Sequence, residues 1–257
     1  MSEDRSRRAF LASLSAVGTA SLAGCTGERP PMEPQLPRRA LEEGGWEHAD
    51  RIDERTRETV ELAGIERNVE FQIRGDVYEN PRPAERVRRQ FNVDAPPFEP
   101  PPAQFMPMKV DMDPSLHRLS GISNRLNQRL LNQLDERLMD QLREDGFQDV
   151  RRVSEGDLDI RHAGTAVHRR YRASYQYDRQ RTEVQGQPVT VEPGTFDIEA
   201  QLAVWPYEGL LAVAGGAYPG ESGVLDVTVS GETRELELGL QYREYRRSVR
   251  ELITLLR

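Results

Sequence analysis

Arginine is the residue type in this sequence with the clearest capacity for chemistry. Of the 35 basic residues, only Lys109 is lysine. Four arginines near the C-terminus are spaced at i, i+3, i+4 and i+7, which places them on one helical face: Arg243, Arg246, Arg247 and Arg250. Because a planar guanidinium binds an anion through two hydrogen bonds, this face is a candidate site for a sugar acid or a lipid headgroup. The alternative is a solvated face paired with acids such as Glu244 and Glu251.

A second set of candidate ligand-binding residues lies on predicted strands. Arg170 and Arg172 share one strand face with His168. Trp205 and Tyr207, with Tyr218 on the next predicted strand, are candidates to line a small pocket. The alternative for these aromatic residues is the hydrophobic core, where aromatic side chains at strand ends are commonly buried.

The remaining polar residues give no catalytic or metal-binding pattern. The four histidines are widely separated in the sequence: His48, His117, His162 and His168. Neither the group Asp157, Asp159 and His162 nor the group Glu47, His48 and Asp50 has the ligand order of a zinc or calcium site. A nucleophile elbow, a phosphate loop and a dinucleotide fingerprint are also missing from the sequence. We therefore predict no catalytic residue, no metal and no cofactor.

The first residues carry the strongest localisation signal. A pair of arginines and a nearby aromatic residue precede a short, weakly apolar run: Arg7, Arg8 and Phe10. This arrangement resembles a twin-arginine export signal, and the run is too short to span a membrane. The run ends in a lipobox pattern, which consists of Leu22, Ala23, Gly24 and Cys25.

The lipobox predicts the fate of the only cysteine. We expect removal of residues 1–24 as a twin-arginine lipoprotein signal peptide and attachment of lipid to the Cys25 thiol. The predicted partners are then the export translocase and membrane lipid. The predicted location is the cell membrane, with the protein lipid-anchored on the extracytoplasmic face.

Composition excludes two classes of protein. The chain has 257 residues, with 43 acidic and 35 basic side chains and a net charge of −8. An acidic chain is a poor nucleic-acid binder, because binding to phosphates needs a basic surface. A single cysteine also excludes an intrachain disulfide framework.

Proline-rich stretches suggest the domain organisation. Residues 25–43 are predicted to form a proline-rich tether, because proline removes a backbone donor and fixes φ. A single domain is predicted over residues 44–257, with a proline-rich loop at 81–107. Alternating apolar residues predict a hairpin over about residues 55–78.

The rest of the chain combines predicted helices and strands. Leucines at spacings of three and four predict a long amphipathic helix over about residues 114–145. Alternating patterns predict strands around residues 167–177, 196–204 and 210–218, and a second helix forms the C-terminus. Residues 224–240 fit either a hairpin or an extension of that helix. We predict an α+β fold: a mainly antiparallel sheet packed by the long helix and the C-terminal helix.

The order of these features resembles a family of halophilic-archaeal lipoproteins of unknown function, exported by the twin-arginine route. The resemblance covers the export signal, the lipobox, the entry at Gly45-Trp46, the segment Pro107 to Val110 and the segment Leu211 to Pro219. It implies an extracytoplasmic location and an α+β domain, and it supplies no activity or site residue.

The leading functional hypothesis is a membrane-anchored extracytoplasmic lipoprotein that is not an enzyme. It would act as a binding or envelope-interaction module for an unknown envelope protein or an anionic ligand. One alternative is an extracellular hydrolase that uses two carboxylates as acid and base. Another is an accessory subunit of a membrane complex.

Overall fold

The computed structural model describes residues 32–62, 65–91, 96, 98, 100–113, 132, 135–136, 139–140, 142–144, 146–184, 186–221 and 223–257. The predicted export signal and lipobox, with Cys25, lie outside the described residues. None of the helices in the described part of the chain is both long and apolar enough to cross a membrane.

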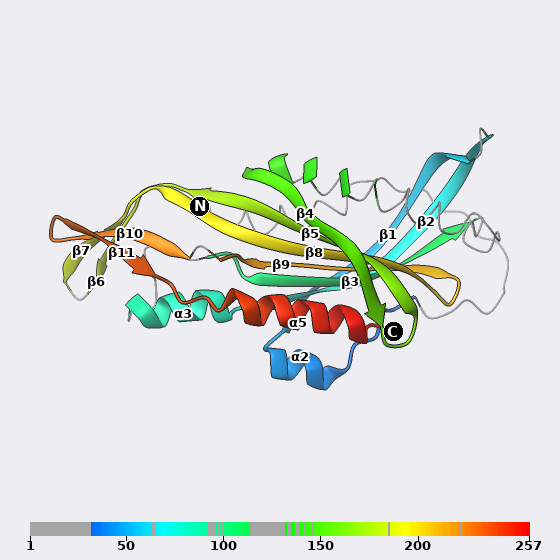
Figure 1. Cartoon of the computed structure of the whole chain (residues 1–257), viewed down its shortest axis with the longest axis horizontal. Helices are drawn as coiled ribbons and strands as arrows, with labels where there is room; N and C mark the ends of the chain where they lie inside the picture. The colour runs from blue at the N-terminus through cyan, green and yellow to red at the C-terminus, as the bar shows by residue number, and fades with distance from the viewer. Residues whose placement is uncertain are drawn as a thin grey trace.

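The largest unit of the described chain is one antiparallel sheet of seven strands (Figure 1). The strand order is β1-β2-β3-β9-β8-β5-β4. In that order the strands are Glu47–Leu62, Ile65–Asn80, Ala103–Asp113, Leu210–Pro219, Gly194–Tyr207, Gly164–Tyr177 and Phe147–Ile160. β1 and β2 form the predicted hairpin, and they are longer than the sequence pattern indicated because the ladder runs from Glu47↔Glu79 to Leu62↔Ile65.

A smaller antiparallel sheet of four strands lies at one end of the molecule (Figure 1). Its order is β11-β10-β7-β6, and the strands are Glu232–Glu237, Val224–Val229, Gln187–Val191 and Gln180–Val184. Residues 224–237 therefore form a hairpin and do not extend the last helix. Its turn residues Ser230 and Gly231 have φ of 52° and 86°, as a two-residue type I′ turn requires.

Three short helices complete the described elements: α2 (Arg38–Gly44), α3 (Arg82–Phe91) and α5 (Tyr242–Leu255). All three lie on the same side of the large sheet in Figure 1. α5 buries Val249 and Ile253 in a cluster with Phe105 on β3 and Ala214 on β9. A second buried cluster, which includes Met106, Tyr171 and Val213, covers the opposite face.

The predicted α+β class is wrong: the described residues form a mainly antiparallel β fold with two sheets and short helices. The sequence predicted a long amphipathic helix over about residues 114–145, but no described element is such a helix packed on the sheet. Residues 114–131 of that prediction lie outside the described residues. Directly before β4 in the sequence, residues 142–144 are helical, and Leu142 is buried in the cluster with Tyr171.

Two stretches predicted to be irregular contain regular structure. The predicted tether at 25–43 includes most of α2, which starts directly after Pro37 and has i,i+4 ion pairs from Arg38 and Arg39. The predicted loop at 81–107 contains α3 and the beginning of β3. Pro83 fits α3 because it lies in the first turn, where a backbone N–H has no helical acceptor.

Pro107 lies inside a central strand, where proline is rare. The β2–β3 ladder pairs Gly75 with Met108 and Tyr78 with Phe105, and it has no pair opposite Pro107. The proline therefore occupies the interruption in this ladder. Gly75 is required beside it, because a Cβ there would lie 2.6 Å from the Pro107 carbonyl oxygen.

The two ends of the described chain meet. Gln35 N donates to Arg257 O at 2.9 Å, and Arg257 N donates to Gln35 O at 3.0 Å. Gln35, near the first described residue, thus lies beside the C-terminal end of α5.

Candidate functional site

α5 is held close to the sheet by a glycine on β9. A Cβ on Gly216 would lie 2.9 Å from Cγ1 of Val249 and 2.7 Å from the Gln104 carbonyl oxygen. Trp46 Nε1 also donates to Ser248 Oγ at 2.9 Å, which joins α5 to the start of β1. With Tyr245, Val249, Leu252 and Ile253 buried, the arginines of α5 lie on its remaining faces.

β5 presents its arginines to the same space. In a strand, successive side chains point to opposite faces, so Arg170 and Arg172 lie on the face opposite Tyr171. Tyr171 belongs to the cluster on the far side of the sheet, and Arg170 and Arg172 face α5. The predicted strand face and the predicted helix face therefore meet, although they are about 70 residues apart in the sequence.

The space between α5 and strands β4, β5 and β8 is a polar groove with two adjoining parts, which we call the arginine groove. Lobe 1 has a volume of about 590 Å³ and includes Arg172, Glu199, Glu221 and Tyr242. Lobe 2 has a volume of about 540 Å³ and includes Ser154, Asp157, His168, Arg247 and Arg250. Arg170, Arg243 and Arg246 line both lobes, so the lobes adjoin along these three side chains.

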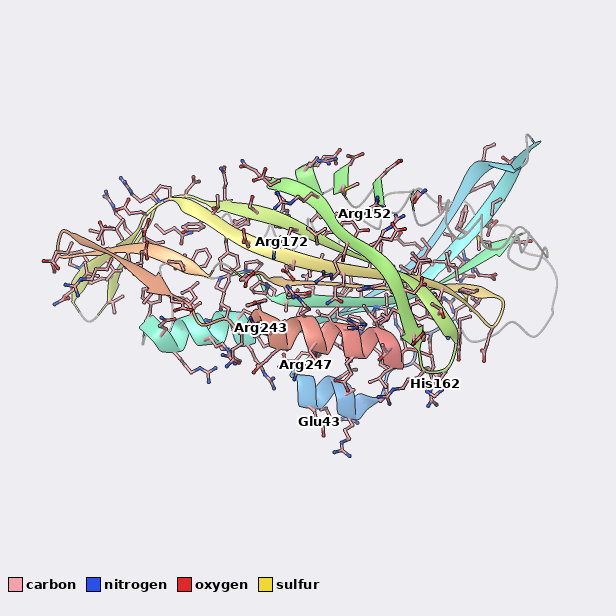
Figure 2. All side chains as sticks on the ribbon, viewed as in Figure 1. Glu43, Arg152, His162, Arg172, Arg243 and Arg247 are labelled. Carbon is pink, nitrogen blue, oxygen red and sulfur yellow. The ribbon has the colours of Figure 1, made fainter. Side chains whose placement is uncertain are left out.

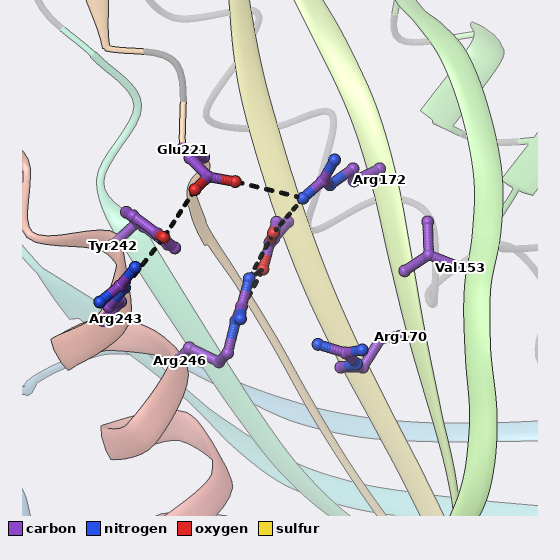
Figure 3. A pocket seen from close by; sticks show the side chains of 8 residues that line it. Val153, Arg170, Arg172, Glu221, Tyr242, Arg243 and Arg246 are labelled. Atoms are coloured by element: carbon purple, nitrogen blue, oxygen red, sulfur yellow. Dashed lines mark hydrogen bonds and ion pairs between the residues drawn. The ribbon is translucent and has the colours of Figure 1, made fainter.

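All six arginines predicted as ligand-binding residues line this groove. Figure 3 shows Arg170 and Arg172 on one wall and Arg243 and Arg246 on the other, all directed toward lobe 1. In Figure 2, Arg172 lies over the sheet, and Arg243 and Arg247 lie along α5. The structure thus brings the two candidate arginine faces of the sequence analysis together, and anion binding itself stays a prediction.

Glu199 on β8 neutralises the innermost arginine. Its carboxylate is only 4% exposed and accepts two bonds of 2.6 Å from Nη2 of Arg246, with a third of 3.0 Å from Nε. Arg172 Nη2 donates to the same carboxylate at 3.3 Å. The hydrogen bond and charge of Glu199 raise the pKa of Arg246. Arg246 therefore stays charged, but its guanidinium is already paired.

A second set of contacts orders the rim of lobe 1. Tyr242 OH donates to Glu221 at 2.8 Å and accepts from Nε of Arg243 at 3.0 Å. The guanidinium carbons of Arg243 and Arg246 lie 5.6 Å and 5.4 Å from the centre of the Tyr242 ring. These contacts hold two arginine side chains against one aromatic ring at the start of α5.

Four arginines of the groove have no ion pair with an acid among the described residues. No described carboxylate lies within 4.0 Å of a side-chain nitrogen of Arg170, Arg243, Arg247 or Arg250, and Arg243 instead donates to Tyr242 OH. Arg170 donates to the neutral hydroxyl of Ser154 at 2.8 Å, and Arg247 and Arg250 are exposed. These side chains keep most of their hydrogen-bonding capacity for a ligand.

The floor of lobe 2 is a buried neutral network. His168, which is 9% exposed, bonds through Nε2 to Gln201 Oε1 at 3.0 Å. Gln201 Nε2 in turn donates to Tyr218 OH at 2.9 Å and to the Arg246 carbonyl at 3.0 Å. Burial lowers the pKa of His168, and the charges of Arg250 and Arg170 lower it further against the opposing effect of the Gln201 bond. His168 is therefore neutral at pH 7.

The aromatic candidates lie elsewhere. Trp205 is 1% exposed in the cluster beneath α5, and Tyr207 packs at the same cluster, where its ring lies 5.0 Å from Lys109 Nζ. Tyr218 is buried beneath the groove, where burial raises its pKa to about 12. Trp205 and Tyr207 therefore do not line the arginine groove, and the core alternative describes Trp205.

Sequence reasoning missed the acidic and amide residues of the groove. Glu199 and Gln201 lie on β8, and both are almost fully buried among apolar neighbours. A signal was present, because a charged residue inside an otherwise apolar strand needs a buried partner. The sequence alone does not identify that partner, since Arg246 is 47 residues away.

The groups considered as metal ligands do not assemble. His48 instead bonds to Asp76 at 3.1 Å, and His162 accepts from Arg257 at 2.9 Å near the C-terminus (Figure 2). Within the part of the chain that the structure describes, no three His, Cys, Asp or Glu residues are grouped as a metal site would require.

The comparisons with known proteins give one match. A family model described as Domain of unknown function (DUF6517) matches residues 33–257, which is almost the whole described chain. No curated protein and no solved structure is significantly similar to the chain.

Proposed function

We propose that this chain, which belongs to the DUF6517 family, binds an anionic ligand in the arginine groove. The observation that carries the proposal is the meeting of six arginines from β5 and α5 around two adjoining lobes. Four of them, Arg170, Arg243, Arg247 and Arg250, have no ion pair with an acid among the described residues. The groove thus has guanidinium groups available for an external carboxylate, sulfate or phosphate.

The local charge of the groove supports the proposal. The whole chain has a net charge of −8, whereas the groove is lined by six arginines and four acidic residues: Glu155, Asp157, Glu199 and Glu221. Three of these acids are already bound by arginines, because Glu199 pairs with Arg246, Glu155 with Arg169 and Glu221 with Arg172. A positive groove on an acidic surface attracts anions locally.

The arrangement of partners separates two roles among the arginines. Glu199 holds Arg246 and Arg172 in place, so these two side chains shape the groove and bind a ligand only in competition with Glu199. Arg247 and Arg250 are exposed at the open side of lobe 2. They are the residues from which we expect the strongest contribution to binding.

The location that we propose is the extracytoplasmic face of a membrane. It is supported by the twin-arginine pattern at Arg7 and Arg8 and by the lipobox that ends at Cys25. Under this proposal the protein is a lipid-anchored binding module. The same sequence features make the export translocase and membrane lipid its partners.

Binding is tested by calorimetric titration of the full chain with glucuronate and with inorganic phosphate. We expect at least one of these anions to bind, and we expect R247E/R250E to weaken its affinity at least about tenfold. The control is R181E/R234E, which makes the same change in charge on exposed arginines of the small sheet. The proposal is wrong if neither anion binds, or if the control loses as much affinity as the groove variant.

The location is tested with Cys25→Ser. We expect this variant to lose the lipid and to leave the membrane fraction, since the thiol is the predicted point of attachment. R7K/R8K should keep the precursor inside the cell with residues 1–24 still attached. Unchanged mature mass and membrane association in both variants would contradict the lipoprotein proposal.

A further inference from the structure

We infer that the ligand of the arginine groove is a linear acidic polysaccharide that occupies both lobes at once. This inference rests on the proposed function and adds the chemical class and the length of the ligand. It follows from three observations: the two lobes share lining residues, the cationic groups are spaced along the groove, and the lining combines arginines with hydrogen-bond acceptors.

The length of the groove exceeds what one anionic group needs. Lobes 1 and 2 have volumes of about 590 and 540 Å³, and each alone lies in the range typical of a pocket for a small organic molecule. Because Arg170, Arg243 and Arg246 line both lobes, the lobes adjoin, and a chain that extends beyond one lobe would reach the other.

The cationic groups are spaced to bind repeated charges. Arg243 and Arg250 are seven residues apart on α5, which corresponds to about 10 Å along the helix axis. Arg170 and Arg172 are two residues apart on β5, or about 7 Å along the strand. A ligand with one acidic group would reach only part of this array, whereas a polymer with an acidic group on each repeating unit would reach all of it.

The lining favours a ligand with many hydroxyl groups. Beside the arginines, the groove contains hydrogen-bond acceptors that suit hydroxyl donors: Ser154, Asp157 and Glu221. A polyphosphate has no hydroxyl groups along its chain to donate to these side chains. A sugar acid brings a carboxylate for the arginines and hydroxyls for the acceptors in the same repeating unit.

An acidic peptide fits the groove less well. Peptide side chains bury apolar carbon when they bind, and among the described residues Val153 is the only aliphatic side chain that lines either lobe. The phenol ring of Tyr242 is already stacked against Arg243 and Arg246. The polar and open character of both lobes therefore favours the interior of a hydrated glycan chain.

The inference is tested by titrating the full chain with galacturonate and tetragalacturonate at one fixed, low ionic strength. We expect the tetramer to bind at least about tenfold tighter than the monomer, since its acidic groups reach both lobes in one binding event. Maltotetraose, a neutral chain of the same length, should not bind. Tripolyphosphate and tetraglutamate should each bind at least about tenfold more weakly than tetragalacturonate.

Variants confined to one lobe test whether both lobes are used. R247E/R250E removes the two arginines that line only lobe 2, and Arg172→Gln removes the arginine that lines only lobe 1. In each variant, the affinity for tetragalacturonate should fall close to the affinity of the same variant for galacturonate. Arg172→Gln should change the affinity for the monomer less than threefold, a limit of about 0.6 kcal/mol.

The outcomes separate this inference from the proposed function. Equal affinity for the monomer and the tetramer would overturn the two-lobe ligand and leave the anion site in place. Tighter binding of tripolyphosphate or tetraglutamate would overturn the polysaccharide and leave an anion site of another class. If no anion binds at all, both the inference and the proposed function are wrong.

Discussion

Arg169 and Arg170 are neighbours in the sequence, but they differ in the sheet face they occupy, in exposure and in hydrogen-bond partners. Arg169 points to the far face of the sheet, where its side chain is 2% exposed. It lies 3.2 Å from Asp135 and donates to Glu155 at 2.8 Å and to Asn132 at 2.7 Å. Arg170 points into the arginine groove, is half-buried and donates to the neutral hydroxyl of Ser154.

The difference shows how burial and partners assign a role to an arginine. A buried guanidinium is costly unless acceptors surround it, so Arg169 with its three polar partners is part of the folded framework. It joins β5 to described helical residues at positions 132 and 135. An accessible guanidinium without an acidic partner contributes little to folding and is available for a ligand.

The largest expected effect is on stability, from Arg169→Met. This change keeps most of the side-chain volume but leaves the buried carboxylate of Asp135 without its closest cation. We expect the free energy of unfolding to fall by about 3 kcal/mol, measured by urea denaturation. A loss below about 1 kcal/mol would remove the distinction between Arg169 and Arg170.

A second change should act in opposite directions on stability and binding. Glu199→Gln removes the charge that holds Arg246 and Arg172, so the free energy of unfolding should fall by about 1.5 to 3 kcal/mol. The released arginines should bind anions severalfold tighter in the calorimetric titration. Glu221→Gln is the matched control, because its side chain is 59% exposed and its removal should cost about 0.5 kcal/mol or less. Weaker anion binding by Glu199→Gln would show that Glu199 does not compete with the ligand.

Arg170→Ala should affect anion binding more than stability, whereas Arg169→Met should affect mainly stability. The free energy of unfolding should change by about 0.5 kcal/mol, since the side chain has one neutral partner and no ion pair among the described residues. The affinity for an anion should fall severalfold, because Arg170 lines both lobes. If stability falls as far as in Arg169→Met, Arg170 belongs to the framework as well.

The smallest expected effect is a pH dependence that comes from His168. Because its pKa is lowered in the folded protein, the unfolded chain takes up the proton first as the pH falls below about 6.5. Stability should therefore decrease between pH 7 and pH 5, and His168→Gln should reduce this decrease. Anion binding beside Arg170 and Arg250 should raise the pKa of His168, which an NMR titration with and without glucuronate measures. No change in that pKa on binding would place the anion away from lobe 2.

The sequence predicted local features better than it predicted the fold class. The β1–β2 hairpin and the strands near residues 196–218 were recognisable because alternation of apolar residues is a local signal. The stretch at 81–107 was misread because its prolines occupy positions that tolerate them: the first turn of α3 and the interrupted β2–β3 ladder. Neither position can be recognised without knowing the neighbouring strand.

The candidate site was predicted in parts. The spacing of Arg243 to Arg250 and the alternation around Arg170 each identified one face correctly as a group. The sequence did not show that these faces meet, because their approach depends on Gly216, where close packing of α5 on β9 leaves no room for a Cβ. Trp205 and Tyr207 fit the sequence pattern of ligand-binding residues, because aromatic residues at strand ends occur both in pockets and in cores.

The pairing of Gln35 with Arg257 has a mechanical consequence. If the chain is held by a tether before residue 33 and pulled by a ligand in the arginine groove, the load enters beside the C-terminal end of α5 and leaves along its arginine face. The load carried by α5 then crosses two backbone hydrogen bonds, whereas the load carried by Arg170 and Arg172 on β5 crosses the ladders of the large sheet. The two bonds at the ends of the described chain therefore share the load with the sheet.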